Sequence, residues 1–483
     1  MDLSQVSSAD LQKALEPISI PTASPKATFQ NWAKTFRCRP ARVFAPTTTL
    51  QCRQILEMGR REGARIHPVG VGHSPSDLAC TNGWLVRMEG VTGLKTIDVE
   101  KSTATFYSGT VLHDVHKLLE AQQPPMALPN IGSISDQTIG GLISTASHGS
   151  GLTFPVLSAH VQSLVLALPH AGAPIVRVSR TEDPDLFTAS LCGLGATGLI
   201  LKVEVEVEPA FRLREIKTAL PVDQVLGHLD EIKGSAEHVR VWWYPDGKGM
   251  VVARANRTYE PAQPVASFMA VLLGYHLTQF FLFCSRIFPS LTSLVGRWAW
   301  WLANVNSEVV NDGHKVLNFD CLFPQYALEW AIPSENTEAC LAEMREWLDR
   351  EAADPKGLRA HFPIEIRWSC KDDIWLSPSQ GRETCWIGLV TFRPYGLAVP
   401  YRKLHTKFAD VLIKYGGRPH WAKEHELRPK EIEALYPDFN KFREVLDRVD
   451  PVGVMRSEYV RRHVDGEEEI AGPVPACDFA RRS

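Results

Sequence analysis

The sequence lacks the motifs of several common metal-binding and enzyme classes. None of its 10 cysteines forms a CxxC pair, which argues against zinc ribbons and thioredoxin-like redox sites. No Walker A, HExxH or GxSxG sequence occurs, and Asp and His do not cluster at metal-ligand spacing, so we expect no metal centre. The scattered cysteines are typical of reduced thiols in an intracellular compartment.

An excess of charge of either sign is also missing. Lys and Arg number 52 against 55 Asp and Glu, for a net charge of -3. This balance excludes a broadly basic nucleic-acid binder and an acidic, solvating tail. Residues 1–17 have neither a basic region before an apolar core nor an Arg-rich, acid-free composition, so we expect no cleaved targeting peptide.

An uninterrupted hydrophobic run long enough to cross a membrane is absent as well. A spanning helix needs about 20 mostly apolar residues. The most apolar stretch, residues 265–304, is interrupted by His276, Gln279, Arg286 and Pro289. Two interpretations remain open. The stretch forms buried helices of a cap domain, or it forms a helical patch on a membrane surface whose interfacial residues are Trp298, Trp300 and Trp301.

What the sequence does contain is ordinary for a globular enzyme. Its 483 residues are 44% apolar and 22% charged, which is enough to bury a large core in two or three domains. A helix is predicted to begin near Thr48 and to stop at Gly63. Residues 200–211 alternate apolar and acidic side chains, which predicts a half-buried strand. Pro209 is expected to end this strand and to mark the first domain boundary. A hairpin is predicted to turn at Pro245–Gly247.

The glycine-rich segment Pro68–Ser76 (PVGVGHSPS) follows a predicted strand. Gly70 and Gly72 permit positive φ angles and a close approach of the backbone to a ligand. Successive exposed N–H groups in such a turn form an anion nest, which suits a pyrophosphate; a tight turn at a strand exit is the alternative. His73 lies within this loop, where a nucleophilic imidazole could attach covalently to a bound cofactor.

A second run of small residues extends from Leu128 to Gly151 and contains five glycines and many hydroxyls. Small side chains let a large flat ligand lie against the backbone, and hydroxyls satisfy its polar rim; a small-residue helix packed on a sheet is the alternative. Gly193–Gly198 also fits GxGxxG. A dinucleotide fingerprint must open a helix, whereas a strand is predicted here, which argues against an NAD(P)-dependent Rossmann site.

Two charged segments complete the candidate site. In the segment FPIEIRW, alternation puts Glu365 and Arg367 on one face of a strand, where they would orient a polyhydroxylated or carbonyl substrate; a structural ion pair is the alternative. A later loop presents His420, Trp421 and Lys423 together, unless it is simply solvated. Side chains alone do not accept electron pairs, so a redox site here requires an organic cofactor.

Taken together, these segments resemble the vanillyl-alcohol-oxidase type of FAD-linked oxidoreductases, and more narrowly the sugar-1,4-lactone oxidases. The resemblance extends from Asn31 to about Arg462. It rests jointly on the segments GHSPS, PNIGSISDQTIGG, HGSG, the 320–333 stretch that ends in EWAIP, EIR and HWAK. One departure is Met455–Tyr459 (MRSEY), where the family has a Phe-x-Asn-x-Tyr pattern.

The resemblance implies an α+β fold. It consists of a two-lobed FAD-binding domain of the PCMH/vanillyl-alcohol-oxidase type and an α+β substrate-binding cap domain. The expected parts are an N-terminal extension (1–36), the FAD-binding domain (37–210), the cap (211–440), and a C-terminal segment (441–483) that packs back on the FAD-binding domain.

The resemblance also implies a site. FAD would be attached through its 8α carbon to His73, with its pyrophosphate on the 69–76 loop and its isoalloxazine on residues 132–151. The implied active-site residues are Glu365, Arg367, His420 and Lys423, and no metal is implied. The implied cofactor-binding residues are Val69, Gly70, Val71, Gly72, His73, Ser74, Pro75, Ser76, Gly132, Ser133, Gln137, Thr138, Gly140, Gly141, Ser144, Thr145, His148, Gly149, Gly198 and Ile200.

The implied activity is oxidation of an aldonolactone such as D-arabinono-1,4-lactone at the carbon that bears the C2 hydroxyl. O2 would be the electron acceptor, and the products would be H2O2 and D-erythroascorbate. Two alternatives stay open: an L-gulono- or L-galactono-1,4-lactone oxidase or dehydrogenase, and a catalytically silent, membrane-associated flavoprotein. The family further implies peripheral attachment to a mitochondrial membrane through residues 265–304, or otherwise a cytoplasmic location.

Overall fold

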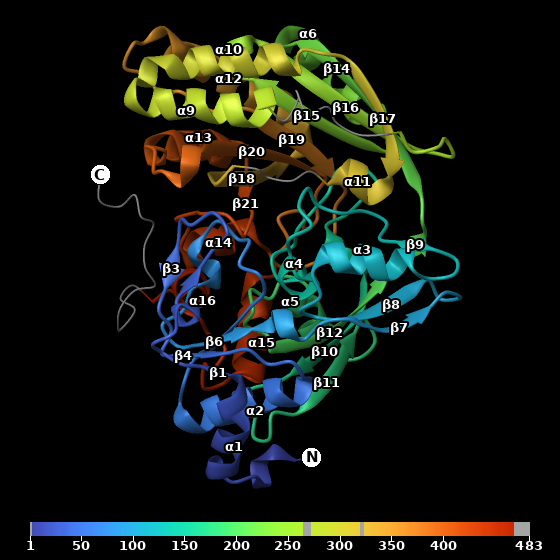
Figure 1. Cartoon of the computed structure of the whole chain (residues 1–483), viewed down its shortest axis with the longest axis vertical. Coiled ribbons are helices and arrows are strands. Elements are labelled where there is room, and N and C mark those ends of the chain that lie inside the picture. The colour runs from blue at the N-terminus through green and yellow to red at the C-terminus, as the bar shows by residue number, and fades with distance from the viewer. Residues whose placement is uncertain (1, 264–271, 319–322, 468–483) are drawn as a thin grey trace.

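The computed structural model describes residues 2–263, 272–318 and 323–467. Figure 1 shows them as a lower lobe, formed mainly by the N-terminal part of the chain, and an upper lobe formed by the segments that follow. Both lobes combine sheets with helices, so the predicted α+β class is confirmed. Among the described residues, no helix is both long enough and apolar enough to cross a membrane.

The lower lobe contains two main sheets. The first, in which the last three strands are mutually parallel, has the order β1 (Ser19–Ile20), β4 (Arg42–Phe44), β6 (Trp84–Arg87) and β5 (Ile66–Val69). The second is antiparallel, with the order β11 (Ile175–Ser179), β10 (Val161–Ala167), β12 (Leu199–Glu206), β8 (Thr103–Tyr107) and β7 (Leu94–Asp98). Two smaller strand pairs are β2 (Phe29–Gln30) with β3 (Arg37–Cys38), and β9 (Met126–Ala127) with β13 (Glu208–Pro209).

Five helices accompany these sheets: α1 (Ser8–Leu15), α2 (Thr49–Glu62), α3 (Leu112–Glu120), α4 (Ile139–Ile143) and α5 (Pro184–Ser190). The predicted limits of α2 are confirmed. Thr48 and Gln51 form a capping box at its start, and Gly63 ends it with φ 64°, a left-handed angle that glycine adopts without strain. Its apolar side chains Ile55 and Leu56 are buried in the lower lobe.

Strand β12 shows the alternation that the sequence predicts. Leu199, Leu201, Val203 and Val205 are buried, whereas the intervening residues are half-buried or exposed. The prediction that Pro209 ends this strand is wrong, because β12 stops at Glu206. Pro209 instead lies in β13 opposite Met126 of β9. A two-residue edge strand tolerates proline, which donates no ladder hydrogen bond.

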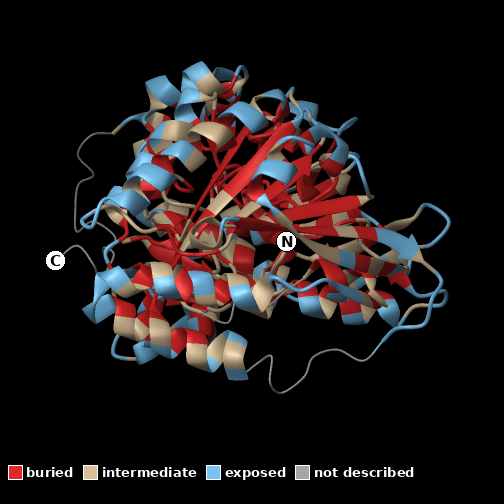
Figure 2. Cartoon of the chain, turned by 90° about the horizontal axis from the view of Figure 1, so that it is seen from above, coloured by how far each residue is buried: buried red, intermediate tan, exposed pale blue. Residues whose placement is uncertain are grey.

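The upper lobe is built on one eight-stranded antiparallel sheet, and Figure 2 shows the buried residues of its strands in red. Its order is β17 (Ser307–Asp312), β14 (Arg212–Pro221), β16 (Gly249–Thr258), β15 (His238–Tyr244), β19 (Ile364–Ser369), β20 (Thr384–Phe392), β18 (Gln325–Pro333) and β21 (Arg418–Pro419). The predicted hairpin is confirmed, since β15 and β16 flank a turn at Pro245–Gly247.

The helices of the upper lobe are α6 (Val222–Leu226), α7 (Leu229–Lys233), α9 (Thr278–Ile287), α10 (Thr292–Ala303), α11 (Gly313–Leu317), α12 (Thr337–Ala353) and α13 (Arg402–Lys414). In Figure 1, α9, α10 and α12 lie on the side of the sheet that faces away from the lower lobe. The opposite side of the sheet therefore faces the lower lobe.

The apolar stretch 265–304 combines features of both predicted alternatives, although its residues 265–271 lie outside the described part of the chain. One face of α9 and α10 is buried through Leu282, Val295 and Ala299, as expected for cap helices. The other face exposes large apolar side chains, namely Phe280, Ile287, Phe288, Leu294 and Trp301. The membrane-surface alternative expects Trp300 at the outer surface, but this side chain is half-buried. It packs against the hairpin turn, where a Cβ on Gly247 or Gly249 would collide with its ring.

Three C-terminal helices return to the lower lobe: α14 (Pro429–Leu435), α15 (Phe439–Val449) and α16 (Glu458–Val460). Two ion pairs join them and their flanks to it, Arg448–Asp183 and Arg462–Asp77, each at 2.8 Å. The Asn82 amide donates to Glu458, and Met455 is buried in a lower-lobe cluster. The MRSEY segment, which departs from the family pattern, therefore packs between α15 and the first sheet.

Candidate active site

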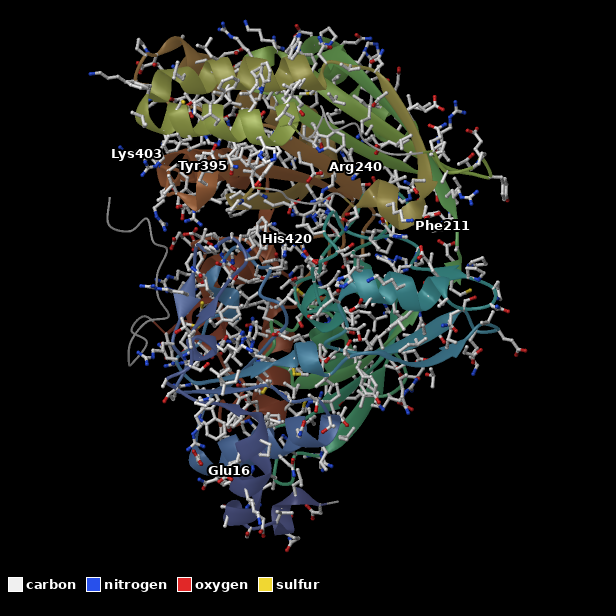
Figure 3. The ribbon with its side chains drawn as sticks, viewed as in Figure 1. Glu16, Phe211, Arg240, Tyr395, Lys403 and His420 are labelled. Atoms are coloured by element: carbon white, nitrogen blue, oxygen red, sulfur yellow. The ribbon has the colours of Figure 1, made fainter. Side chains whose placement is uncertain are left out.

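Two cavities meet between the lobes. The first has a volume of about 1040 Å³ and lies in the lower lobe. The second, of about 1160 Å³, lies under the sheet of the upper lobe. Figure 3 shows His420 at the boundary between the lobes. The residues that line both cavities are Ile134, Gln137, Ser147, His420 and Lys423. A ligand that fills the first cavity therefore meets the contents of the second at these side chains.

Most of the predicted cofactor-binding residues line the first cavity: Val69, Gly70, Val71, Gly72, His73, Ser74, Pro75, Gln137, Thr138, Gly140, Gly141, Ser144, Thr145, Gly198 and Ile200. Two glycines explain how the loop after β5 is held. A Cβ on Gly70 would collide with Thr138, the N-cap residue of α4. Gly72 has φ 73°, and a Cβ there would lie 2.6 Å from the Phe29 ring.

The other predicted cofactor-binding residues lie elsewhere. Gly132, Ser133 and His148 line the second cavity. Ser76 and Gly149 line neither cavity. Ser76 is buried and accepts a hydrogen bond from the Leu78 amide. Gly149 is confined by Asn130, with which a Cβ would collide. Local packing therefore explains why these two positions carry a serine and a glycine.

The GxGxxG segment behaves as the sequence predicts. It follows α5 and leads directly into β12, so no helix opens at its glycines. Gly195 and Gly198 have positive φ angles, 77° and 125°, and both line the first cavity. This turn therefore forms part of the cavity wall.

His73 occupies an unusual environment at the first cavity. Its ring stacks on Trp32, with 4.8 Å between centroids and 20° between planes. Its Nε2 atom is buried and has no hydrogen-bond partner among the described residues. Burial is the main reason that the pKa of His73 is lowered to about 4, and the charge of the Lys423 ammonium lowers it further. The imidazole is therefore neutral and nucleophilic at physiological pH.

A charged cluster lines the second cavity, and the sheet register assembles it. Glu365 on β19 and Glu329 on β18 both lie opposite Gly388 of the intervening strand β20. Because Gly388 has no side chain, the two carboxylates flank an open space in the cavity wall. Arg367 lies two residues along β19 from Glu365, on the same strand face, which confirms the predicted alternation.

Glu329 is the centre of this cluster. Its carboxylate lies 2.5 Å from Arg367 Nη2, 3.8 Å from Lys423 Nζ and 3.2 Å from His148 Nε2. Burial alone would favour the neutral acid, but Arg367, His148 and Lys423 hold the pKa of the Glu329 carboxyl well below its usual range. Glu329 is therefore an anion that neutralises part of the surrounding positive charge.

Arg367 links this carboxylate to both lobes. Its Nε lies 3.5 Å from Glu365, and its Nη1 donates to the Ser133 hydroxyl of the lower lobe. Glu365 in turn accepts a hydrogen bond of 3.4 Å from Trp242 Nε1. The guanidinium is thus fixed between two carboxylates at the edge of the cavity.

His420 is held as a neutral hydrogen-bond donor. Its backbone amide donates to the Glu329 carbonyl, and the Ala422 amide donates to its Nδ1 at 3.1 Å. An accepting Nδ1 puts the ring proton on Nε2. Burial, despite the nearby Glu329, lowers the pKa of His420 well below its ordinary value. His420 can therefore donate a hydrogen bond from Nε2 without carrying charge.

His148, Glu329 and His420 bring their donor atoms within 4.8 Å of one another, as metal ligands do. The cations beside them weigh against a divalent ion, because Arg367 and Lys423 already neutralise Glu329. His148 is also stacked on Trp386, at 3.6 Å between centroids and 10° between planes. This trio is better described as part of a hydrogen-bonded, charged wall.

The sequence did not single out Glu329, Trp242 or Trp386 as site residues. Glu329 is in the EWAIP segment, but its neighbours on β18 are buried on both faces, so alternation gives no signal for it. Glu329 contacts Arg367 only because the strand order places β18 next to β20, which in turn pairs with β19.

The first cavity fits a long cofactor with a pyrophosphate and a flat ring system. It combines a glycine-rich loop, the hydroxyls of Ser74, Thr138 and Ser144, and a buried imidazole nitrogen without a partner among the described residues. The second cavity fits a small polar substrate at its charged end.

Comparisons with known proteins agree with this arrangement. The family model described as "FAD binding domain" matches residues 40–174, and the one described as "D-arabinono-1,4-lactone oxidase" matches residues 203–463. An L-gulonolactone oxidase from Scyliorhinus torazame is 36% identical over 436 residues, which cover 90% of this chain and 97% of that protein. A D-arabinono-1,4-lactone oxidase from Eremothecium gossypii is 30% identical, over 82% of this chain and 83% of that protein.

Solved structures show the same fold. A cholesterol oxidase from B. sterolicum superposes with a TM-score of 0.76 at 14% identity, and the match covers 93% of this chain and 99% of that one. The predicted fold, a PCMH-type FAD-binding domain with a cap, is confirmed by this similarity together with the FAD-binding match.

Proposed function

The chain belongs to the aldonolactone oxidase family of FAD-dependent oxidoreductases, and we propose that it oxidises D-arabinono-1,4-lactone with O2 to D-erythroascorbate and H2O2. The observation that carries the proposal is that the charged cluster of the second cavity borders the FAD cavity at Lys423 and His420. FAD, when bound, accepts a hydride from the substrate and passes the electrons on.

The charged residues have distinct roles in this proposal. As the C2 hydroxyl gives up its proton to water, Arg367 and Lys423 stabilise the alkoxide oxygen, because both are cations that line the second cavity. Glu365 holds Arg367 and accepts hydrogen bonds from substrate hydroxyls. His420 donates from Nε2 to a substrate oxygen and closes the cavity wall.

L-Gulono-1,4-lactone is the second candidate substrate, because the L-gulonolactone oxidase above is more similar in sequence than the D-arabinono-1,4-lactone oxidase. A panel of aldonolactones with peroxide detection separates the two. We expect the highest kcat/KM with D-arabinono-1,4-lactone. Turnover with an artificial acceptor but without peroxide would contradict O2 as acceptor and indicate a dehydrogenase.

Covalent attachment of FAD to His73 is part of this proposal, supported by the buried, neutral imidazole at the first cavity. His73→Ala is expected to release all its flavin on acid precipitation, whereas the wild-type pellet stays yellow and fluorescent. Because His73 is neutral above about pH 5, the attachment rate should be flat between about pH 6 and pH 8. Acid-stable flavin in His73→Ala would contradict the assignment.

Peripheral attachment to a membrane, in mitochondria, is the remaining part of the proposal. Its support is the exposed apolar face of α9 and α10, where Phe288 is 61% and Trp301 62% exposed. The double variant Phe288→Ser/Trp301→Ser is expected to sediment with anionic lipid vesicles several-fold less than wild type. Val452→Ser, which alters an exposed apolar residue of the lower lobe, serves as the control. Equal sedimentation of all three proteins would contradict attachment through these helices.

A further inference from the structure

We propose that residues 31–36, the turn between β2 and β3, form a brace that positions His73 for attachment to FAD, with Trp32 as the positioning residue. This inference rests on the proposed covalent link at His73. The turn lies outside the predicted FAD-binding domain and touches the loop 72–75 from the side of the N-terminal extension.

Three hydrogen bonds fix the brace to successive residues around His73. The Trp32 amide donates to the Gly72 carbonyl at 2.9 Å. The Asn31 side-chain amide donates to the Ser74 carbonyl at 3.0 Å, and the Thr35 hydroxyl donates to the Pro75 carbonyl at 3.2 Å. The backbone on both sides of His73 is thereby held by one short segment.

The brace is itself rigid. Asn31 Oδ1 accepts from the amides of Thr35 and Phe36 at 2.9 and 3.1 Å, and Asn31 Nδ2 also donates to the Thr35 hydroxyl. Phe29 and Phe36 belong to a buried cluster that includes Val69, the last residue of β5. Phe29 approaches Gly72 so closely that no Cβ fits there.

The Trp32 ring then sets the orientation of the imidazole. The stacked Trp32 ring covers one face of the His73 imidazole. Trp32 does not line either cavity, so it acts on the cofactor only through His73. The stack thereby limits the rotation of the nucleophile, and a misplacement of about 1 Å is enough to slow a reaction about 100-fold.

The reaction that would join His73 to FAD balances in atoms and electrons. A C–N bond replaces one C–H bond of the 8α methyl group. The proton of that C–H bond and the imidazole N–H proton leave, and the electron pair is finally taken by O2, the acceptor that the proposed oxidase activity already uses.

The test measures covalent attachment separately from FAD binding. Apoprotein from riboflavin-starved cells is mixed with FAD in air, and SDS-stable flavin fluorescence is followed over time, beside total bound FAD. The full-length variants are Trp32→Leu, Trp32→Phe, Thr35→Val and His73→Ala. Trp84→Leu is the matched control, because Trp84 is a buried tryptophan of the same lobe that lines neither cavity.

Trp32→Leu is expected to bind FAD but to attach it about tenfold or more slowly, since the nucleophile is no longer oriented. Trp32→Phe, which keeps an aromatic face, should recover most of the rate, and Trp84→Leu should attach at the wild-type rate. Thr35→Val should be slowed several-fold, and this variant decides the question if Trp32→Leu does not fold.

Attachment at the wild-type rate in Trp32→Leu, or in Thr35→Val should the former not fold, would overturn the brace. An equally slow Trp84→Leu would also overturn it, because the effect would then reflect stability alone. Absence of SDS-stable flavin in wild-type protein, or its presence in His73→Ala, would instead refute the proposed covalent link itself.

Discussion

Lys423→Met is expected to lower kcat/KM for the lactone by about 10²- to 10³-fold, the usual effect of removing one group that stabilises a developing oxyanion. Lys423 is a cation that lines both cavities, and its ammonium is 3.8 Å from Glu329. Methionine keeps most of the length of the side chain and removes the ammonium group with its charge and hydrogen-bond donors. The measurement is the steady-state rate of peroxide formation over a range of lactone concentrations.

Two controls separate chemistry from folding in this variant. The flavin content and the unfolding temperature of Lys423→Met should stay close to wild type, because the side chain is only partly buried. Lys403→Met removes an exposed lysine of α13, which Figure 3 shows away from His420, and should leave kcat/KM unchanged. A Lys423→Met enzyme within about threefold of wild type would remove this residue from the proposed mechanism.

Glu329→Gln is expected to reduce both activity and stability. Glutamine leaves Arg367 and Lys423 without their shared buried counter-ion, and breaking a buried ion pair from one side costs about 3–5 kcal/mol. The displaced guanidinium no longer meets the substrate oxygen, so we expect kcat to fall by about 100-fold or more. Stopped-flow flavin reduction and thermal unfolding measure the two effects.

Glu338→Gln, an equivalent change at an exposed position of α12, is the matched control and should behave as wild type. The outcome that would count against the account is a Glu329→Gln enzyme with normal flavin reduction. It would mean that Arg367 keeps its place through Glu365 and Ser133 alone.

Local signals in the sequence predict local structure well here. The capping residues Thr48 and Gly63 define α2, and alternation correctly puts Glu365 and Arg367 on one strand face. The strand after the GxGxxG segment is likewise predicted correctly, because alternation at β12 is strong. Each of these features depends on neighbours within a few residues.

The parts of the site that depend on long-range packing could not be predicted. Glu329 meets Arg367 through strand order, and His148 reaches Glu329 from the other lobe. Ser76 and Gly149 fall within cofactor-like motifs, yet each is used for local packing. Motif membership alone therefore does not tell which residues of a loop face the ligand.

The most direct test of the account is anaerobic mixing of the flavin-loaded protein with D-arabinono-1,4-lactone while flavin absorbance is recorded. Rapid and complete bleaching is expected in wild type, and bleaching slowed by about 10²-fold or more is expected in Lys423→Met. Flavin that stays oxidised with this lactone and with L-gulono-1,4-lactone, in protein that carries its full complement of FAD, would contradict this expectation.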